Sequence, residues 1–403
     1  MTAPLDNIRV LDMSRVLAGP WAGQLLGDYG ADVVKVERPG SGDDTRQWGP
    51  PWLAGKEGGE SAYFLSTNRN KRSITIDLAT EQGQALAREL VAKADVVLEN
   101  FKVGTLDRYG LDAQSMLSIN PRLIVCSISG FGRTGPRASE PGYDAMIQAS
   151  AGLMSITGEP DEAGGGPQKV GVAIADIMAG MYAVTAILAA LNARTVSGRG
   201  QHIDVPLYDS QVAWLANQNM NFLVGGVVPG RMGTGHPNLV PYQAFPTADG
   251  AIMLAVGNDR QFASTMDCLG LGEYATDPRF ARNRDRILNR GPLVAMMTEA
   301  FAARASAHWI AELMARGVPA GPINDIGEVL TNDHAQQRGL VRTLDNSAGD
   351  AVPMVANPVT FDATPVRYER APPLLGEHTE EVLQEWLGYS AKRIAALRNA
   401  TVI

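Results

Sequence analysis

Residues that build metal centres and disulfide frameworks are scarce in this sequence. The 403 residues include two cysteines, Cys126 and Cys268, and five histidines. One pair of cysteines excludes a disulfide framework, and neither residue type shows the spacing of metal ligands. No histidine lies near a serine nucleophile motif. A metal site and a Ser–His–Asp hydrolase are therefore not expected, and Cys126 is predicted to pack in the core.

Signatures of nucleotide, nucleic-acid and membrane binding are also missing. No Gly-x-Gly-x-x-Gly stands between a strand and a helix, and no Walker loop ends in Gly-Lys-Ser/Thr. The formal net charge of −8 and the pI near 5.3 argue against a nucleic-acid partner. The N-terminus lacks the basic and apolar regions of a signal peptide. The longest apolar stretch, Ile174–Leu191, contains Asp176 and is predicted to be a buried helix. We expect a cytoplasmic protein without a membrane segment.

Strand and helix signals alternate through the first 200 residues. The predicted strands are 8–12, 33–37, 73–77, 96–98 and 123–128, and the first helices are 21–29 and one that begins at Thr80. The last two strands are continuous apolar runs, typical of strands that are buried on both faces. This alternation predicts an α/β fold with a doubly wound, mostly parallel, Rossmann-like sheet.

The pattern changes in the second half of the chain. A second module runs from Tyr242 to about Asn324, with a hairpin at 245–254. Helices are predicted at 261–269, 292–304 and 307–316. We expect a large domain in 1–224, a smaller α/β domain in 225–328 and a C-terminal tail in 329–403.

Asp176 lies between an apolar run, 170–175, and a stretch that is predicted to be a helix, Ile177–Ala193. A lone carboxylate at this point has two interpretations. It is an N-cap that accepts backbone N–H groups of the first helical turn, which cap statistics alone favour. Alternatively, it is a nucleophile that the helix end keeps ionised and that attacks an acyl group.

Cations of the first half cluster near predicted strand ends. Arg15 and Arg38 each follow a strand, Arg108 and Arg137 lie in later loops, and Asn68–Arg72 holds three cations. Each one alone is typical of a solvated surface residue. Together they would suit a ligand with several phosphates, because such ligands gather at strand ends and guanidinium groups bind phosphate oxygens in pairs. Spacing does not decide between these interpretations.

Several motifs resemble those of one enzyme family, and they occur in order along almost the whole chain. They are Arg15–Pro20, Gly30–Asp43, Asn68–Ser73, Glu99–Phe101, Gly198–Gln201 and Pro373–His378. The chain is thereby identified as similar to the class III coenzyme A transferases, which include formyl-CoA and carnitine CoA transferases and α-methylacyl-CoA racemases. The resemblance implies CoA and acyl-CoA as substrates with no tightly bound cofactor. It also implies an interlocked homodimer, in which the C-terminal tail returns to the large domain.

By this resemblance Asp176 is the catalytic aspartate. Its carboxylate would attack the donor thioester to form a mixed anhydride, and the released thiolate would then form an aspartyl-CoA thioester. An unperturbed aspartate, with a pKa of ~3.9, is ionised at neutral pH without further help. The oxyanions need hydrogen-bond donors, and the backbone N–H groups around Gly233 and Gly235 are our candidates.

The resemblance also assigns residues of the binding site by position. The expected CoA contacts are Val16, Leu17, Ala18, Arg38, Ile76, Asp77, Leu78, Ala79, Asn100, Phe101, Lys102, Arg108, Arg137 and Tyr143. Trp48 and Asp144 match positions near the substrate pocket of formyl-CoA transferase. At Leu17 this chain differs from that enzyme, which has a glutamine close to its reacting centre. Another residue must therefore supply a polar side chain there.

One motif separates the transferases from the racemases of this family. Racemases pair the aspartate with the histidine of a Gly-His-Asp motif, because proton exchange at an α-carbon needs a second acid or base. This chain has Gly142-Tyr143-Asp144 instead. Tyrosine, with a pKa of ~10, is a poor proton carrier at neutral pH, which favours CoA transfer over epimerisation. A non-catalytic acyl-CoA-binding protein is a third alternative.

Four further segments are most similar to the succinyl-CoA:glutarate branch, whose members act on short dicarboxylates such as glutarate and itaconate. They are 43–51, 63–70, 232–236 and 240–245. The second carboxylate of such an acid needs a cation, because an unpaired buried charge is costly. We nominate Arg46, with Arg231 or His236 as second choices. An exposed loop position is the alternative for Arg46, and formate, oxalate or carnitine are alternative acceptors.

Overall fold

The computed structural model describes residues 2–403 and divides into two compact units. Unit 1 comprises 2–153, 170–220 and 333–403, and unit 2 comprises 154–169 and 221–332. The main boundaries lie within four residues of those expected at 224/225 and 328/329. The membership of 154–169 in unit 2 was not foreseen, because this short loop segment has no periodic signal of its own.

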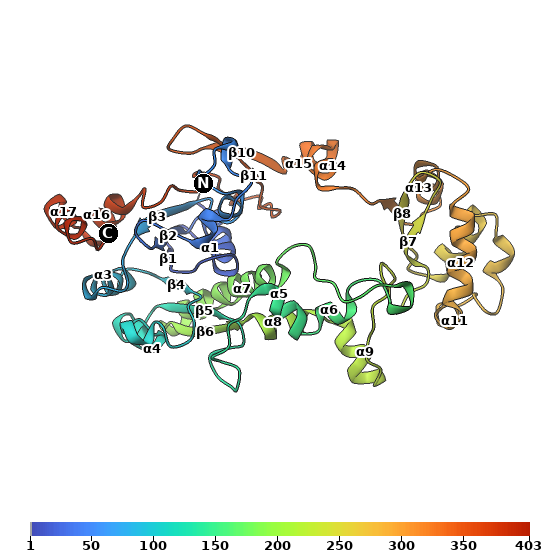
Figure 1. The fold of residues 1–403 in the computed structure, drawn as a ribbon, viewed down its shortest axis with the longest axis horizontal. Coiled ribbons are helices and arrows are strands. Elements are labelled where there is room, and N and C mark those ends of the chain that lie inside the picture. The colour runs from blue at the N-terminus through green and yellow to red at the C-terminus, as the bar shows by residue number, and fades with distance from the viewer. Residues whose placement is uncertain (1) are drawn as a thin grey trace. The chain divides into compact units, whose positions relative to one another are not determined.

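Unit 1 is built on a six-stranded sheet in which every strand pair is parallel (Figure 1). Its strands are β1 (Arg9–Asp12), β2 (Asp32–Glu37), β3 (Lys71–Thr75), β4 (Val96–Glu99), β5 (Ile124–Ser129) and β6 (Gln201–Pro206). They lie in the order β3-β2-β1-β4-β5-β6. The chain therefore moves outward from β1 on one side and returns to β4 on the other. This reversal opens a crevice at the carboxyl ends of β1 and β4, where ligands of such sheets bind.

Helices cover both faces of this sheet. The helices that lie within unit 1 are α1 (Ala18–Asp28), α2 (Ala62–Leu65), α3 (Glu81–Val91), α4 (Ala113–Ile119), α5 (Asp144–Ser150), α7 (Ile174–Ser197), α8 (Leu207–Trp214), α15 (Asp333–Arg338), α16 (Thr379–Leu387) and α17 (Ala391–Asn399). A two-stranded ladder, β10 (Val341–Asp345) with β11 (Ala351–Val355), lies between α15 and α16 along the chain.

Neighbouring residues of a strand point to opposite faces, and the two apolar cores of unit 1 follow this rule. Val10 packs with α1, α5 and α7, whereas Leu11 packs with α3, α4 and the C-terminal α16 and α17. The tail therefore completes one face of the sheet. This arrangement confirms the predicted doubly wound α/β fold.

Unit 2 is a smaller α/β body with its own core around Phe245, Phe262 and Phe301. Its elements are β7 (Tyr242–Pro246), β8 (Ala251–Ala255), α10 (Asp259–Cys268), α11 (Asn283–Leu288), α12 (Arg290–Phe301), α13 (Ser306–Ala315), β9 (Ala320–Pro322) and α14 (Ile326–Thr331). β7 and β8 form the predicted hairpin. Two helices, α6 (Leu153–Ile156) and α9 (Asn217–Gly225), cross the unit boundaries.

Candidate active site

The helix that carries Asp176 begins earlier than predicted. α7 starts at Ile174, and its N-cap, Ala173, offers no side-chain hydrogen bond. Asp144, the first residue of α5, supplies the missing acceptor, since its Oδ1 lies 2.8 Å from the Ala175 backbone nitrogen. Its Oδ2 accepts from Gln148 Nε2 at 2.7 Å. The N-cap interpretation of Asp176 is therefore wrong, because Asp144 performs that role from another helix.

Asp176 is left with an unoccupied carboxylate in the first turn of α7. Among residues 2–403 no side chain or backbone group donates a hydrogen bond to it, and no cation pairs with it. Burial, together with the negative charge of Asp144, raises the pKa of Asp176 to about 7. This pKa differs from the unperturbed value that the sequence analysis assumed. At neutral pH a substantial share of the carboxyl groups is protonated.

Tyr63 lies within the electrostatic reach of Asp176. Burial raises the pKa of the Tyr63 phenol, and the charges of Asp176 and Asp144 add to that shift. The ring of Tyr63 also packs edge-on against Trp48, with ring centroids 5.0 Å apart. Trp48, an expected substrate residue, is 44% exposed. Tyr63 was not among the predicted site residues, because an aromatic residue in a short helix is ordinary core material.

Asp176 lines a cavity of about 320 Å³ at the switch point of the sheet, which we call the Asp176 pocket. Its wall comes from the loops after β1, β4 and β5 and from the start of α5. The lining residues are Arg15, Val16, Ala18, Asp44, Asn100, Phe101, Lys102, Val103, Ile128, Ser129, Gly130, Ala138, Glu140, Pro141, Gly142, Tyr143, Asp176 and Leu207. The cavity therefore lies where an open α/β sheet binds its ligand.

A second cavity of about 290 Å³, the Arg38 pocket, adjoins the first. The two share Arg15, Asp44 and Phe101. It is lined by Met13, Arg15, Lys35, Val36, Glu37, Arg38, Ser41, Gly42, Asp43, Asp44, Ile76, Asp77, Leu78, Ala79, Phe101, Thr105 and Tyr109. Because they share these residues, the two pockets together extend the lining from Asp176 to residues that follow β3.

Most of the expected CoA contacts fall into these pockets. The Asp176 pocket holds Val16, Ala18, Asn100, Phe101, Lys102 and Tyr143, and the Arg38 pocket holds Arg38, Ile76, Asp77, Leu78, Ala79 and Phe101. Three residues lie outside both linings. Leu17 is 7% exposed and Arg108 is on the surface. Arg137 pairs with Glu140 at 2.8 Å and stacks on Phe131, so its charge is already matched.

Arg15 is a functional candidate that the site assignment missed. Its backbone N–H donates to Asn100 Oδ1 at 2.9 Å, and Asn100 Nδ2 donates to the Arg15 carbonyl at 2.7 Å. These two hydrogen bonds join the loops that follow β1 and β4. The guanidinium carbon of Arg15 lies 5.6 Å from the centre of the Phe101 ring. In the sequence, its position directly after a predicted strand indicated that Arg15 could contact a ligand.

Arg46 is not available to a ligand. Its guanidinium donates to Glu37 at 2.8 and 2.7 Å, to Glu60 at 3.0 and 2.9 Å, and to the Pro373 carbonyl at 3.1 Å. These five hydrogen bonds match the five N–H groups of an arginine. The structure therefore argues against Arg46 as the cation for a second carboxylate. Arg46 is buried and instead holds together the segments that contain Glu37, Glu60 and Pro373.

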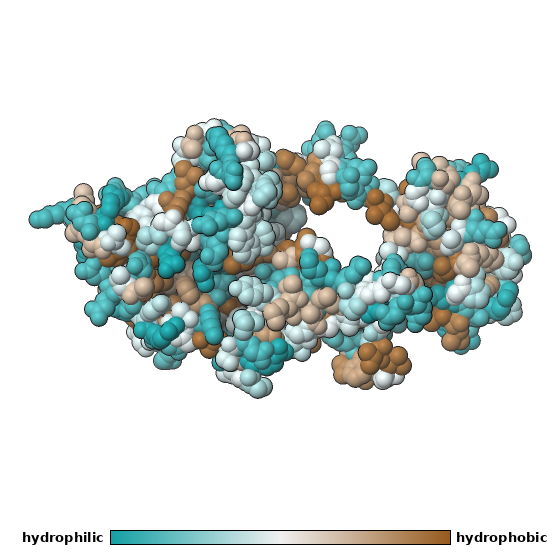
Figure 2. Space-filling view, viewed as in Figure 1, coloured by the Kyte–Doolittle hydropathy of each residue, from teal (hydrophilic) through white to brown (hydrophobic). Residues whose placement is uncertain are grey.

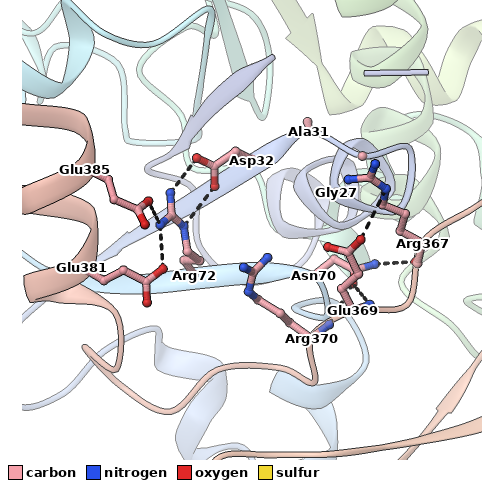
Figure 3. A pocket seen from close by; sticks show the side chains of 11 residues that line it. Gly27, Ala31, Asp32, Asn70, Arg72, Arg367, Glu369, Arg370, Glu381 and Glu385 are labelled. Carbon is pink, nitrogen blue, oxygen red and sulfur yellow. Dashed lines mark hydrogen bonds and ion pairs between the residues drawn. The ribbon is translucent and has the colours of Figure 1, made fainter. Parts of the chain in front are cut away.

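The cations of Asn68–Arg72 are neither surface residues nor phosphate ligands. Arg69 pairs with Asp28 at 2.5 Å and Lys71 with Asp12 at 2.9 Å, all buried. Arg72 pairs with Asp32, Glu381 and Glu385, as Figure 3 shows for a polar pocket beside the starts of β2 and β3. Charged residues almost never lie buried unless they are paired, and here each has its partner.

The predicted glycine-rich loop lies in unit 2. The Gly233 backbone N–H donates to the Gly158 carbonyl at 3.0 Å, and the Gly235 N–H donates to the Met232 carbonyl at 2.8 Å. Both groups are thus occupied within the loop and its support, which contradicts their expected role as free oxyanion donors. His236 packs beside Tyr242, with ring centroids 5.2 Å apart.

No three His, Cys, Asp or Glu side chains gather in residues 2–403 where they would hold a metal ion. Within the part of the chain that the structure describes, one helix, α7, has the length and apolar composition to cross a membrane. Its Ala179, Ala183 and Ile187 are fully buried in the core that also contains α1. Packing therefore accounts for part of its apolar character, since 44% of its most apolar window is buried.

Comparison with known proteins adds independent information. The model of CoA-transferase family III matches residues 5–379. Succinate–glutarate CoA-transferase of Agrobacterium fabrum is 50% identical over 384 residues, which cover 95% of each chain. Succinyl-CoA:glutarate CoA-transferase of Homo sapiens is 40% identical, over 99% of this chain and 90% of that protein. A crystal structure of a CaiB/BaiF family protein from Brucella suis superposes with a TM-score of 0.83 at 48% identity, over 96% of this chain and all of that one.

Proposed function

The chain belongs to CoA-transferase family III, and on this premise we propose that it transfers CoA from succinyl-CoA to glutarate or a closely similar short dicarboxylic acid. The observation that carries the proposal is the carboxylate of Asp176, which has no partner and lines a pocket at the switch point. The donor and acceptor come from the 50% identical relative that is named for succinate and glutarate.

The proposed reaction passes through covalent intermediates on Asp176. Its carboxylate attacks the succinyl thioester, the C–S bond breaks, and CoA leaves as a thiolate from an aspartyl–succinyl anhydride. The thiolate attacks the aspartyl carbonyl, and succinate leaves. Glutarate attacks the resulting aspartyl-CoA thioester, which forms a second anhydride and frees the thiolate again. Attack on the glutaryl carbonyl yields glutaryl-CoA and restores the carboxylate, with no net uptake or release of a proton.

CoA would occupy the two adjoining pockets. The side chains of Arg38 and Lys102 are exposed and have no partner among residues 2–403, so they are available to phosphate groups. Guanidinium and ammonium groups are the usual partners of phosphate. Arg15 and Phe101 line both cavities and would contact the middle of the ligand. The reactive thioester would then lie at the Asp176 end.

Racemase activity is the alternative within the same family. It needs a second proton carrier near the acyl α-carbon, and Tyr143 stands where the racemases have histidine. Tyr143 is 66% exposed at the start of α5. We therefore place CoA transfer ahead of epimerisation.

The test is an acceptor series with the purified protein. Succinyl-CoA is incubated with glutarate, itaconate, oxalate or carnitine, and without an acceptor, and the CoA esters are identified by mass spectrometry. We expect glutaryl-CoA from wild type and none from Asp176→Ala. An exposed glutamate, Glu57→Gln, serves as the control substitution. Absence of any acceptor-dependent ester would overturn the proposal, and α-proton exchange of a branched acyl-CoA in deuterated water would then support the racemase.

We also propose that the protein is a homodimer. Large apolar side chains are exposed on α9 and just after it: Phe222 (49%), Leu223 (71%), Val224 (79%), Val227 (70%) and Val228 (74%). Figure 2 shows apolar surface gathered over α9. Such a contiguous patch is unusual on a monomer. Light scattering on a size-exclusion column should give twice 42.9 kDa, and a mass of 42.9 kDa at micromolar concentration would contradict the dimer.

A further inference from the structure

Val16 adopts a backbone conformation that its side chain disfavours. Its φ of 71° lies in the left-handed region, which six non-glycine residues among 2–403 adopt. Two of the six are asparagines, Asn7 and Asn70, a residue type that tolerates this region. A β-branched residue rarely enters it, because there its Cβ approaches the following carbonyl oxygen too closely. Such strained residues persist only where their surroundings hold them, and they gather at functional sites.

Two side chains hold the backbone at Val16. Its N–H donates to both carboxylate oxygens of Asp43, at 3.2 Å each. The preceding residue, Arg15, is bound by Asn100, whose Oδ1 accepts its N–H at 2.9 Å and whose Nδ2 donates to its carbonyl at 2.7 Å. Asp43 follows β2 and Asn100 follows β4, the two strands that flank β1 in the sheet. The strained turn after β1 is therefore held from both neighbouring strands.

This turn forms part of the wall of the Asp176 pocket. Arg15, Val16 and Ala18 all line the cavity, and α1 begins two residues after Val16. The conformation of Val16 therefore determines where these three residues stand relative to the pocket. Asn100 lines the same cavity, but both ends of its amide group are bound to the Arg15 backbone. That geometry suits a residue that shapes the wall, whereas the resemblance assigned Asn100 to direct contact with CoA.

We propose that Asn100 is a positioning residue, which keeps Val16 in its strained conformation and thereby gives the Asp176 pocket the shape that receives CoA. The inference rests on the proposed function, because that function places CoA in this pocket. The two hydrogen bonds from Asn100 offset the strain at Val16. Without them the turn relaxes to another φ, and CoA binds more weakly because only a fraction of the molecules keeps the binding conformation.

A double-mutant cycle separates this positioning role from a direct contact with CoA. The Kd of free CoA is measured by titration calorimetry for wild type, Asn100→Ala, Val16→Gly and the double variant. Glycine adopts a positive φ without strain, so Val16→Gly should rescue the loss of Asn100. We expect Asn100→Ala to raise the Kd about 10-fold in the wild-type background and about 3-fold or less in the Val16→Gly background.

Ala54→Gly is the matched control for the relief of strain. Ala54 also has a positive φ, of 53°, but it is exposed and lies outside the lining of the Asp176 pocket. The effect of Asn100→Ala on the Kd should therefore be the same in the Ala54→Gly background as in wild type. Rescue by Ala54→Gly as well would overturn the inference, because it would not depend on the turn at Val16.

A second variant keeps the test available if thermal melts show that Asn100→Ala is unfolded. Asn100→Asp retains the acceptor for the Arg15 N–H but loses the donor to the Arg15 carbonyl, and its added charge cancels in the cycle. An equal or larger effect in the Val16→Gly background would indicate direct contact with CoA and overturn the inference, as would no effect in either background. Failure to form glutaryl-CoA would instead overturn the proposed function. The two failures are distinguishable because CoA binding is measured without an acceptor.

Discussion

Two aspartates at one helix end have different roles because their hydrogen bonds differ. Asp144 caps α7 through Ala175 and accepts from Gln148, so both of its oxygens are occupied. Asp176 has neither contact and lies half-buried, where the negative charge of Asp144 acts on it. The oxygens of Asp144 are thus engaged in hydrogen bonds, whereas the carboxylate of Asp176 is free and has a raised pKa, which makes its ionised form a better nucleophile. Such pairs with separated roles are common in enzyme sites.

The raised pKa of Asp176 predicts a pH-dependent rate. Attack on the thioester needs the ionised carboxylate, whose share increases as pH rises through its pKa of about 7. With a pKa of about 7, roughly a tenth of the carboxyl groups are ionised at pH 6. We expect kcat for glutaryl-CoA formation to rise with pH through about 7 and to level off above it, as measured by initial rates between pH 5 and 9.

Asp144→Asn is the matching variant. An asparagine oxygen can still accept the Ala175 N–H, but the negative charge beside Asp176 is gone, so the pKa of Asp176 falls. The inflection of the rate profile should move to lower pH, with some loss of stability from the weakened contact to Gln148. An unchanged inflection in a folded Asp144→Asn protein would show that Asp144 does not control the ionisation of Asp176.

At the scale of elements, α7 is placed by close packing on α1. A Cβ built at Gly180 would lie 2.7 Å from the Ala18 carbonyl oxygen and 3.1 Å from Trp21 Cδ1. Gly180 is one turn after Asp176 on the same helix face. The close approach of the two helices therefore depends on this glycine, and it fixes the position of the reacting carboxylate.

Gly180→Ala should consequently impair both folding and catalysis. Overpacking costs about 1–3 kcal/mol of the free energy of unfolding, and a shift of α7 would lower kcat as Asp176 moves. Chemical denaturation and initial rates measure the two effects. Gly171→Ala, at a position with no atom within 4 Å of the added Cβ, is the control for which little change is expected. Wild-type stability in Gly180→Ala would show that the helices can separate at no cost.

Buried ion pairs fix the loops that form the pocket. Lys35 contacts Asp43 at 2.9 Å, and Asp43 in turn accepts from the backbone N–H groups of Val16 and Thr45. Burial opposes ionisation of Asp43, but Lys35 and these hydrogen bonds outweigh it and hold the pKa at about 2. The Asp43 carboxylate is therefore ionised at neutral pH, and it joins the loop after β2 to the loop after β1 through the Val16 N–H.

At the scale of the whole molecule, the C-terminal tail stabilises the sheet far from the site. Trp386 of α16 is 3% exposed, and its Nε1 donates to Asp32 Oδ2 at 2.9 Å. Trp386→Ala should reduce the free energy of unfolding by about 3–5 kcal/mol, as for other buried large-to-small changes. Urea denaturation measures the loss. The half-exposed Trp48→Ala is a control with a smaller expected effect, and equal losses in the two variants would contradict this role of the tail.

The sequence predicted the helices and strands well, but it predicted poorly which side chains contact one another. Strand positions follow from local apolar runs, so β1 to β5 lie within two residues of their predicted bounds. Asp176 stood out because a charge is rare in an apolar stretch. Local patterns could not show that Asp144 caps α7, because that contact joins two different helices. They also could not show that Arg46 is enclosed by Glu37 and Glu60, because the irregular loops between these residues have no periodicity that would predict how they fold back.

The order of segments in unit 1 has a consequence for synthesis on the ribosome. The sheet is complete at Pro206, but Leu383 and Trp386, which cover one of its faces, are translated only after all of unit 2. At 5–20 residues per second, the nascent chain exposes that apolar face for roughly ten seconds or more. During this time the emerging sheet is a natural client for chaperones, and slow translation of the tail would favour aggregation over folding.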